Sequence, residues 1–319
     1  MPGCCSRHST RRTPGQRKAP RSDRCGLLLA YAASAGTAGA RMLGRGRWAA
    51  RAPLLAIITY LAAAWSVVAA LGLAGLTLAV HATAPGGGLS QLIGACVLRL
   101  RDAYATPGGA TAAGLGLTLA AAVLARTALT AVTHLRGVRQ HAVQHPQTAR
   151  LVGHAEPALG AVLVDHGQPA AYCVAGPHPT VILTTAALQT LDPDQLDAVL
   201  AHERAHLASH DHRLLAIAKI GRQVLPFLPL MRDADTQITR LVEMHADDAA
   251  TADRDAGPLA TALVVLAAAG PAPGLAAAAT DAVQRIQRLL RPAEPLSRVR
   301  RQLLRAGAAA LALTPCCSR

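Results

Sequence analysis

The stretch DPDQLDAVLAHERAHLA, from Asp192 to Ala208, decides the architecture of this chain. Its opening is typical of a helix start, with Asp192 suited to the N-cap, Pro193 to the first helical position and Asp194 to the first turn. Within it, His202-Glu203-Arg204-Ala205-His206 places two imidazoles four residues apart, which is one face of a helix. The pattern predicts a helix that presents both imidazoles to one metal ion, with the Glu203 carboxylate beside them.

A hydrolytic zinc site needs about three protein ligands and an open fourth position, so a third ligand is required. Glu243, on a separate predicted helix, is one candidate, and Asp247 follows one turn later, placed to accept a hydrogen bond from a ligand histidine. His212 is the rival, because it completes the longer pattern H-E-x-x-H-x-x-G-x-x-H except that Ser209 occupies the glycine position. Serine lacks the conformational freedom of that glycine, which favours Glu243.

Such a site predicts hydrolytic chemistry on a protein or peptide substrate. Bound zinc would lower the pKa of a water molecule to ~7 and polarise a scissile carbonyl. Glu203 would take the proton of that water and pass it to the leaving amine. We expect the strand Thr180–Thr184, just before the catalytic helix, to pair with an extended substrate. His245, Arg240 and Arg213 are open alternatives for stabilising the oxyanion.

Apolar runs precede the catalytic segment. The chain has 319 residues, of which 51% are hydrophobic, and a mean hydropathy of +0.28, which is too apolar for an ordinary soluble domain. Leu54–Val80 has no charged residue and exceeds the ~20 residues that cross a bilayer. Ala110–Thr133 is a second predicted span, interrupted only by Arg126, which either snorkels or faces a partner helix. Gly26–Ala40 is a third and weaker one.

The net charge of +14 and the pI near 10.6 raise the question of nucleic acid. The arginines instead crowd beside the apolar runs without interleaved aromatic residues, so no direct nucleic-acid binding is expected. The positive-inside rule places residues 41–51 and everything after 134 in the cytoplasm, and residues 85–109 outside. The basic residues 1–25 also favour the cytoplasm. Either Gly26–Ala40 does not cross, or the leader is an atypical extension.

We therefore expect a multi-pass protein of the cell membrane, in contact with the lipid bilayer, whose catalytic domain is cytoplasmic. The expected parts are a disordered basic leader (1–25), a membrane region with two to three transmembrane helices (26–133), a basic connector (134–150), a zinc metallopeptidase domain (151–300) and a short apolar tail (301–319). Short strands are predicted at Ala161–Val164, Ala171–Val174 and Thr180–Thr184, and further helices at Asp235–Asp253 and Leu259–Ala269, after breaks at Gly221, Pro226 and Pro229.

The seven cysteines do not suggest a disulfide framework. Their number is odd and no C-x-x-C occurs, so a zinc ribbon is not indicated either. The basic start followed by an apolar stretch is not a clean signal peptide, because a long membrane segment follows soon after.

Several segments together resemble the BlaR/MecR-type membrane zinc peptidases and, more distantly, the HtpX and CAAX-protease group. They are Ala171–Gly176, Val181–Leu188, His202–His206 with Asp211, and Glu243-x-x-x-Asp247. The resemblance implies a membrane α+β fold, with transmembrane helices and a mostly helical gluzincin-type zinc peptidase domain that carries a small β-sheet. It implies the zinc ligands His202, His206 and Glu243, the catalytic residue Glu203, and supporting roles for Asp211 and Asp247.

Signalling members of that family cleave a repressor of β-lactamase genes, so a BlaI-type transcriptional repressor is the substrate that the resemblance suggests. Two departures matter: the chain has no long C-terminal penicillin-binding sensor, and its last apolar helix is shortened near Leu313. The alternatives are a catalytically silent membrane regulator that binds a repressor and a quality-control protease of HtpX type. An intramembrane site-2-type protease is disfavoured, because charged residues such as Asp194, Asp197 and Asp211 flank the histidine pair.

Overall fold

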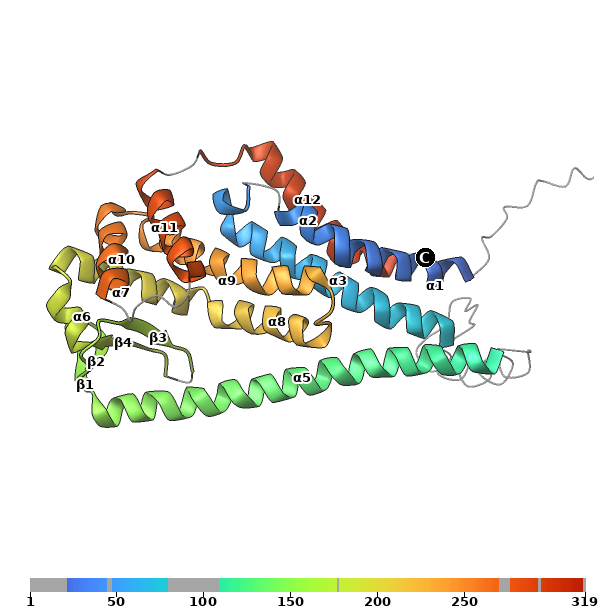
Figure 1. The fold of residues 1–319 in the computed structure, drawn as a ribbon, viewed down its shortest axis with the longest axis horizontal. Coiled ribbons are helices and arrows are strands. Elements are labelled where there is room, and N and C mark those ends of the chain that lie inside the picture. Colours follow the sequence, from blue (N-terminus) through green and yellow to red (C-terminus); the bar gives the residue numbers. More distant parts are fainter. Residues whose placement is uncertain are drawn as a thin grey trace, which may run out of the picture.

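The structure, a computed structural model, describes residues 22–44, 48–79, 109–176, 178–269, 276–291 and 294–317. Long helices extend to one end of the molecule, and a small sheet with shorter helices forms the other (Figure 1). The helical elements are α1 (Ser22–Ser34), the π-helical η1 (Ala35–Gly39), α2 (Ala40–Gly44), the 3-10 turn η2 (Ala49–Arg51), α3 (Pro53–Ala79), α5 (Gly109–Val152), α6 (Thr185–Thr190), α7 (Pro193–Ala208), α8 (Asp211–Val224), α9 (Pro229–Ala250), α10 (Gly257–Ala269), α11 (Ala276–Leu290) and α12 (Arg298–Cys317). The predicted combination of many helices with a small sheet is confirmed.

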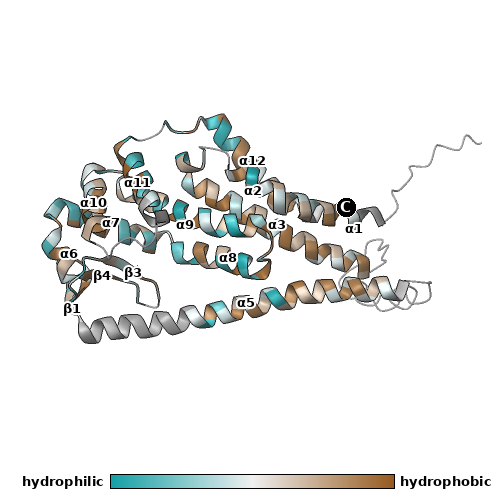
Figure 2. Cartoon of the chain, viewed as in Figure 1, coloured by the Kyte–Doolittle hydropathy of each residue, from teal (hydrophilic) through white to brown (hydrophobic). Residues whose placement is uncertain are grey.

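By length and composition, two described helices could cross a bilayer: α3, and α5 from Thr111 to Gly137. They coincide with the two stronger predicted spans. Of the most apolar window, 56% is buried in α3 but only 17% in α5. Large apolar side chains on α5, including Leu115, Leu124 and Leu129, therefore face outwards, and the hydropathy colouring shows this helix at the edge of the molecule (Figure 2).

Small residues bring α3 and α5 together. Gly75 and Ala79 are four residues apart on α3, and Gly116 and Ala120 repeat this spacing on α5. A Cβ added at Gly116 would lie 2.6 Å from the Gly75 carbonyl oxygen, and one added at Gly75 would lie 2.7 Å from the Ala120 nitrogen. Paired small residues at this spacing allow two backbones to approach closely and are typical of helix pairs in membranes.

The sheet has the order β1-β2-β4-β3, formed by His154–Glu156, Ala161–Val164, Thr180–Thr184 and Ala171–Val174 respectively. The three predicted strands are confirmed, and β1 was not predicted. β2 and β4 are parallel, whereas β1 and β3 pair antiparallel at the two edges. The expectation that Thr180–Thr184 pairs with a substrate is wrong, because both of its sides are already hydrogen-bonded. β3 is the edge strand beside α7.

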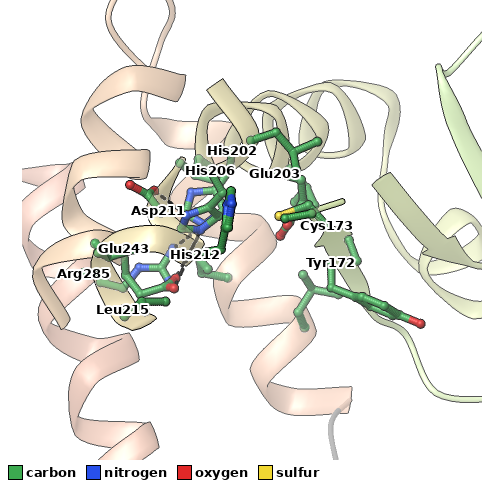
Figure 3. A pocket seen from close by; sticks show the side chains of 18 residues that line it. Tyr172, Cys173, His202, Glu203, His206, Asp211, His212, Leu215, Glu243 and Arg285 are labelled. Carbon is green, nitrogen blue, oxygen red and sulfur yellow. Dashed lines mark hydrogen bonds and ion pairs between the residues drawn. The ribbon is translucent and has the colours of Figure 1, made fainter. Parts of the chain in front are cut away.

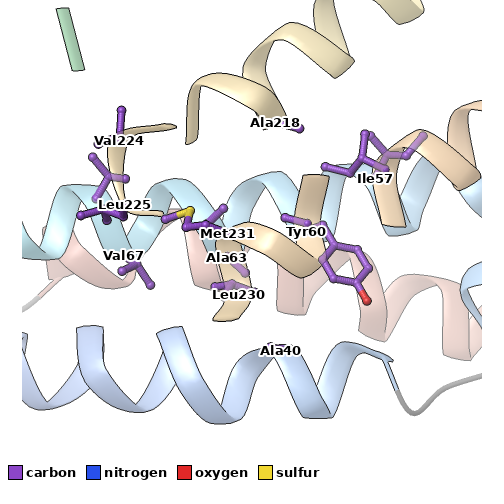
Figure 4. Packing of buried hydrophobic residues seen from close by; sticks show 14 of the residues in the cluster. Ala40, Ile57, Tyr60, Ala63, Val67, Ala218, Val224, Leu225, Leu230 and Met231 are labelled. Atoms are coloured by element: carbon purple, nitrogen blue, oxygen red, sulfur yellow. The ribbon is translucent and has the colours of Figure 1, made fainter. Parts of the chain in front are cut away.

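Two apolar clusters meet in the middle of the molecule. One joins α1 and α3 to α8 and α9; Tyr60 and Val67 of α3 pack beside Leu230 and Met231 of α9 (Figure 4). The other joins β2 and β4 to α7, α10 and α11, around Leu183 and Val199 among others. Consequently α7 is held by the second core, whereas α9 is held mainly by the first and reaches the second only at Ala250.

Several predicted boundaries are wrong. α5 runs without a break through residue 134, so the connector 134–150 is the end of that helix. α9 begins at Pro229 rather than near residue 235, since proline suits a first helical position, and α8 continues through Gly221 to Val224. α12 begins before the predicted tail, and α11 was not predicted. Residues 1–21 and most of the predicted outside segment (85–108) lie outside the described residues.

Arg126 faces a partner helix, one of the two expected alternatives. Its Nε donates to the carbonyl oxygen of Val224 at 2.7 Å, and its Nη2 to that of Gln223 at 2.9 Å. These carbonyls end α8 and have no partner within that helix, and a cation is favoured at this end of a helix. The one charge in the second apolar run thus joins α5 to α8.

Gly116→Leu is expected to force α3 and α5 apart, because its side chain has no room against the Gly75 backbone. Overpacking of this kind destabilises by ~1–3 kcal/mol, so the thermal midpoint of the full-length protein in detergent should fall. Gly114→Leu is the matched control on the same helix, since nothing lies within 4 Å of a Cβ there. Equal midpoints for the two variants would contradict the close packing.

Candidate metal centre

Local signals and one long-range contact fix the position of α7. The Asp192 side chain accepts a hydrogen bond from Gln195 N at 2.9 Å, and the Gln195 side chain accepts one from Asp192 N at 3.2 Å. This capping box, with Pro193 in the first turn, confirms the predicted helix start. Farther along α7, Arg204 Nη2 donates to the carbonyl oxygen of Leu159 in the β1–β2 turn at 2.7 Å. The helix is therefore anchored to the sheet.

The three predicted ligand side chains converge. The Nε2 atoms of His202 and His206 lie 3.1 Å apart. Glu243 Oε2 is 3.6 Å from His202 Nε2, and Glu243 Oε1 is 3.7 Å from His206 Nε2. One ligand atom from each side chain lies within 4.8 Å of the others. Ligands of a tetrahedral zinc ion, bound at ~2.0–2.1 Å, are about 3.3 Å apart. The donor set therefore fits zinc.

A buried carboxylate faces the other ring nitrogen of each histidine. His206 Nδ1 donates to Asp211 Oδ2 at 2.8 Å, and His202 Nδ1 lies at an ion-pair distance of 3.1 Å from Asp247 Oδ1. Asp211 and Asp247 are both almost completely buried. Carboxylates in this position fix the tautomer and the ring orientation of a histidine, which leaves Nε2 for a metal. The structure places both side chains where supporting roles were expected.

The turn between α7 and α8 brings Asp211 back to His206. It is made by His210, whose φ of 54° lies in the left-handed region. The backbone of Ser209, which the sequence predicts to disfavour a sharp turn, keeps a right-handed helical conformation, and the chain turns at the next residue. His212 lines the same cavity as the converging side chains, but its ring is not part of the converging set.

Arg285 of α11 joins these groups and was missed from the sequence. Its Nε and Nη2 donate to the two oxygens of Asp247 at 2.9 and 2.7 Å, and its Nη1 donates to Glu243 Oε2 at 2.8 Å. Nη2 also lies 3.3 Å from His202 Nε2. A bidentate guanidinium group is the partner that best balances a buried carboxylate. Arg285 thus holds Glu243, the predicted ligand, and Asp247, the predicted supporting residue, in one arrangement.

These contacts shift the pKa values of the site. Burial lowers the pKa of His202, but the Asp247 and Glu243 carboxylates outweigh it and raise this pKa to about 9. Burial raises the pKa of Glu243, yet His202 and Arg285 outweigh it and hold this pKa below its usual value. Arg285 and His202 have the same effect on the pKa of Asp247. Both acids therefore stay ionised at neutral pH, which is the form in which Glu243 can act as a metal ligand.

A cavity of about 510 Å³ opens beside the converging side chains, and Tyr172, Cys173, Glu203 and His212 line it (Figure 3). Burial raises the pKa of Glu203, although His202 and His206 oppose the shift. Burial and the neighbouring Glu203 raise the pKa of the Cys173 thiol to about 12, so the thiol stays protonated beside this carboxylate. The edge strand β3 thereby contacts the predicted catalytic carboxylate through Cys173, which the sequence analysis did not single out.

The three candidates for oxyanion stabilisation do not line this cavity. Arg240 pairs with Asp281 at 2.7 Å, and His245 Nδ1 lies 3.9 Å from the second oxygen of Asp211. Arg213 is exposed. The expectation that one of these three residues stabilises an oxyanion in this cavity is therefore wrong. His212 and Arg285 have N–H groups that can donate hydrogen bonds, and both line the cavity.

Residues 139–289 match the model of peptidase family M48. The matched region, just under half of the chain, is therefore similar to that family. The match confirms the resemblance to membrane zinc metallopeptidases of the BlaR and HtpX type, and it contains every predicted site residue. Comparison with curated proteins and with solved structures found no match. The M48 region extends from the end of α5 to α11, so it includes the unpredicted Arg285.

Asp247→Asn is expected to lower the free energy of unfolding by ~3–5 kcal/mol, because buried Arg285 would lose the fully buried carboxylate that accepts two of its hydrogen bonds. Asp248→Asn is the matched control: the neighbouring Asp248 pairs with Arg288 but is 46% exposed, and such pairs contribute ~0–1 kcal/mol. Denaturant unfolding of both full-length variants in detergent measures the difference. Equal losses would show that the buried pair does not hold the site together.

Proposed function

We propose that this chain is an integral-membrane zinc endopeptidase that hydrolyses peptide bonds in a cytoplasmic or membrane-associated protein. The observation that carries the proposal is the convergence of His202, His206 and Glu243 beside Glu203, in a cavity next to a sheet edge. The similarity of the M48 region to a metallopeptidase family supports it.

In the proposed mechanism His202, His206 and Glu243 hold zinc, which when bound polarises a carbonyl group and acidifies water. The Glu203 carboxylate accepts a proton from the attacking water and returns it to the leaving amide nitrogen. Its raised pKa suits both steps, because a catalytic group works best when its pKa lies near the operating pH. The protonated Cys173 thiol beside Glu203 helps to hold this carboxylate towards the cavity.

The position of β3 suggests how a substrate binds. Among the described strands, β3 lies at the sheet edge nearest the metal centre, and Ala171, Tyr172 and Cys173 line the cavity. An extended peptide can add to a free edge through backbone hydrogen bonds. We propose this arrangement, which needs a substrate segment without regular structure at the cleavage site.

The membrane location rests on α3 and α5. A core helix would be mostly buried, whereas only 17% of the apolar window of α5 is. A large exposed apolar surface is typical of a region that contacts lipid or a protein partner. The close contact at Gly75 and Gly116 is of the kind found between membrane helices. By the positive-inside rule, the arginines beside these helices favour a cytoplasmic position for the peptidase domain.

The finer assignment, cleavage of a BlaI-type transcriptional repressor in signalling, rests on the resemblance to signalling members alone. Quality control of membrane proteins, as in HtpX, is the alternative activity. A silent regulator is less favoured, because both the ligand set and Glu203 are intact.

Glu203→Gln is expected to reduce proteolysis by about 10²–10⁴-fold, the usual effect of losing a general base, while bound zinc stays unchanged. The assay follows cleavage of a labelled, unfolded protein by the purified full-length chain. Glu294→Gln is the control, since Glu294 is exposed and lines neither of the two largest cavities described. If Glu203→Gln cut as fast as this control, the enzyme assignment would be wrong and a regulator favoured.

Glu243→Gln and His212→Ala separate the two possible third ligands. We expect Glu243→Gln to lose zinc, measured by elemental analysis after dialysis, because only two donors would remain. His212→Ala should keep one zinc ion per chain and lose only part of its activity, since His212 lines the cavity without joining the converging set. The reverse result would assign the third position to His212.

A further inference from the structure

A second cavity, of about 560 Å³, lies between η2 with the start of α3, the last turns of α9, and α12. It shares no lining residue with the cavity at the metal centre. One wall consists of Arg51 and residues of α3 up to Ala62, and the facing wall runs from Arg301 to Ala312 on α12. The two helices pack against each other, and both lead from a basic end to an apolar end. We call this space the α3–α12 groove.

The basic end of the groove carries three guanidinium groups, those of Arg51, Arg301 and Arg305. All three residues are exposed, and the described part of the chain places no carboxylate within 4.0 Å of them. The acid in the groove is Asp248, and it already accepts from Arg288 at 2.6 Å with both oxygens. The basic end therefore has positive charge available for an anion.

The other end of the groove is apolar. Leu54 and Ile58 of α3 are 43% and 47% exposed, although they lie in the long apolar helix. Ala309 and Ala312 face them from α12, and their small side chains leave the groove open. The lining residues of each wall follow one helix face over about three helical turns, so they form one continuous channel rather than scattered contacts.

We propose that the α3–α12 groove binds one anionic phospholipid, with the phosphate at the three arginines and an acyl chain between α3 and α12. The proposal rests on the membrane location in the proposed function, but not on peptidase activity. A free phosphate would leave the apolar part of the groove uncovered. A nucleic acid would place its charged backbone against that apolar part. A phospholipid alone combines an anionic group and a long apolar chain in the order that the groove presents.

The position of the groove links it to the metal centre through α9. His245 and Asp248 line the groove, while Glu243 and Asp247 of the same helix point to the metal centre. A lipid headgroup at the arginines would thus contact the helix that supplies the third ligand. We expect lipid occupancy to stabilise α9 as well as to anchor α12.

The test measures retention of phosphatidylglycerol by the full-length chain in detergent, titrated and followed by native mass spectrometry. Arg301→Gln with Arg305→Gln should weaken binding roughly 10- to 30-fold, since each arginine near a headgroup contributes about 1 kcal/mol. Arg298→Gln with Arg300→Gln is the matched control: the same helix loses the same charge, but these residues are exposed and do not line the groove. Equal weakening in both pairs would indicate general electrostatic attraction and overturn the proposal.

A second pair of variants tests the apolar end. Ala309→Phe should block the channel and reduce retention about as strongly, whereas Ala310→Phe, exposed on the same helix outside the groove, should not. Equal retention of phosphatidylcholine, full competition by inorganic phosphate, or a chain dimer that Ala309→Phe dissociates would each overturn the proposal. Treatment of membranes with alkaline carbonate tests the membrane location separately, since an integral membrane protein is not extracted. A failure of the lipid-binding proposal can therefore be distinguished from a failure of the proposed membrane location.

Discussion

The buried Asp247 carboxylate is the constraint on which the rest of the site depends. It is completely inaccessible to water, and an ionised carboxylate there requires nearby positive charge and hydrogen bonds. Arg285 supplies them with two donors, and His202 lies at ion-pair distance. Because Asp247, His202 and Arg285 come from α9, α7 and α11, satisfying one charge fixes three helices. The Nε2 atoms and the Glu243 carboxylate converge as a consequence, since Arg285 also holds Glu243.

This arrangement explains why the ligands come from two separate apolar cores. α7 packs with the sheet and α10, whereas α9 packs mainly with α3 and α8, and the two helices also contact each other. Neither core alone brings Glu243 to the two histidines. The polar network spans the junction between the cores, and the turn at His210 closes it from the other side by returning Asp211 to His206. Because the polar site lies between the two apolar clusters, a cavity for a substrate can open there without disrupting the packing of either cluster.

Local signals allowed much of this to be predicted. Asp192 and Pro193 mark the start of α7, and the histidine spacing gives one helix face, because both depend on neighbours within a few residues. Three strands were found from short runs of β-type residues, but their order was not, since pairing is non-local. For this reason the sequence alone points wrongly to Thr180–Thr184 as the strand that pairs with a substrate. Arg285 escaped notice because one arginine among 32 basic residues carries no signal until α11 packs against α9.

Basic residues serve as structural partners where the long helices meet the peptidase domain. Arg126 of α5 binds the carbonyls that end α8, and Arg288 of α11 donates to the Ala50 carbonyl oxygen just before α3, at 2.8 Å. The domain is thus fastened to α3 and α5 at several points rather than carried on a linker. In the proposed membrane orientation, the distance between the bilayer and the metal centre is then set by the fold. A substrate must bring an extended segment to that distance, which favours proteins already held at the membrane surface over freely diffusing ones.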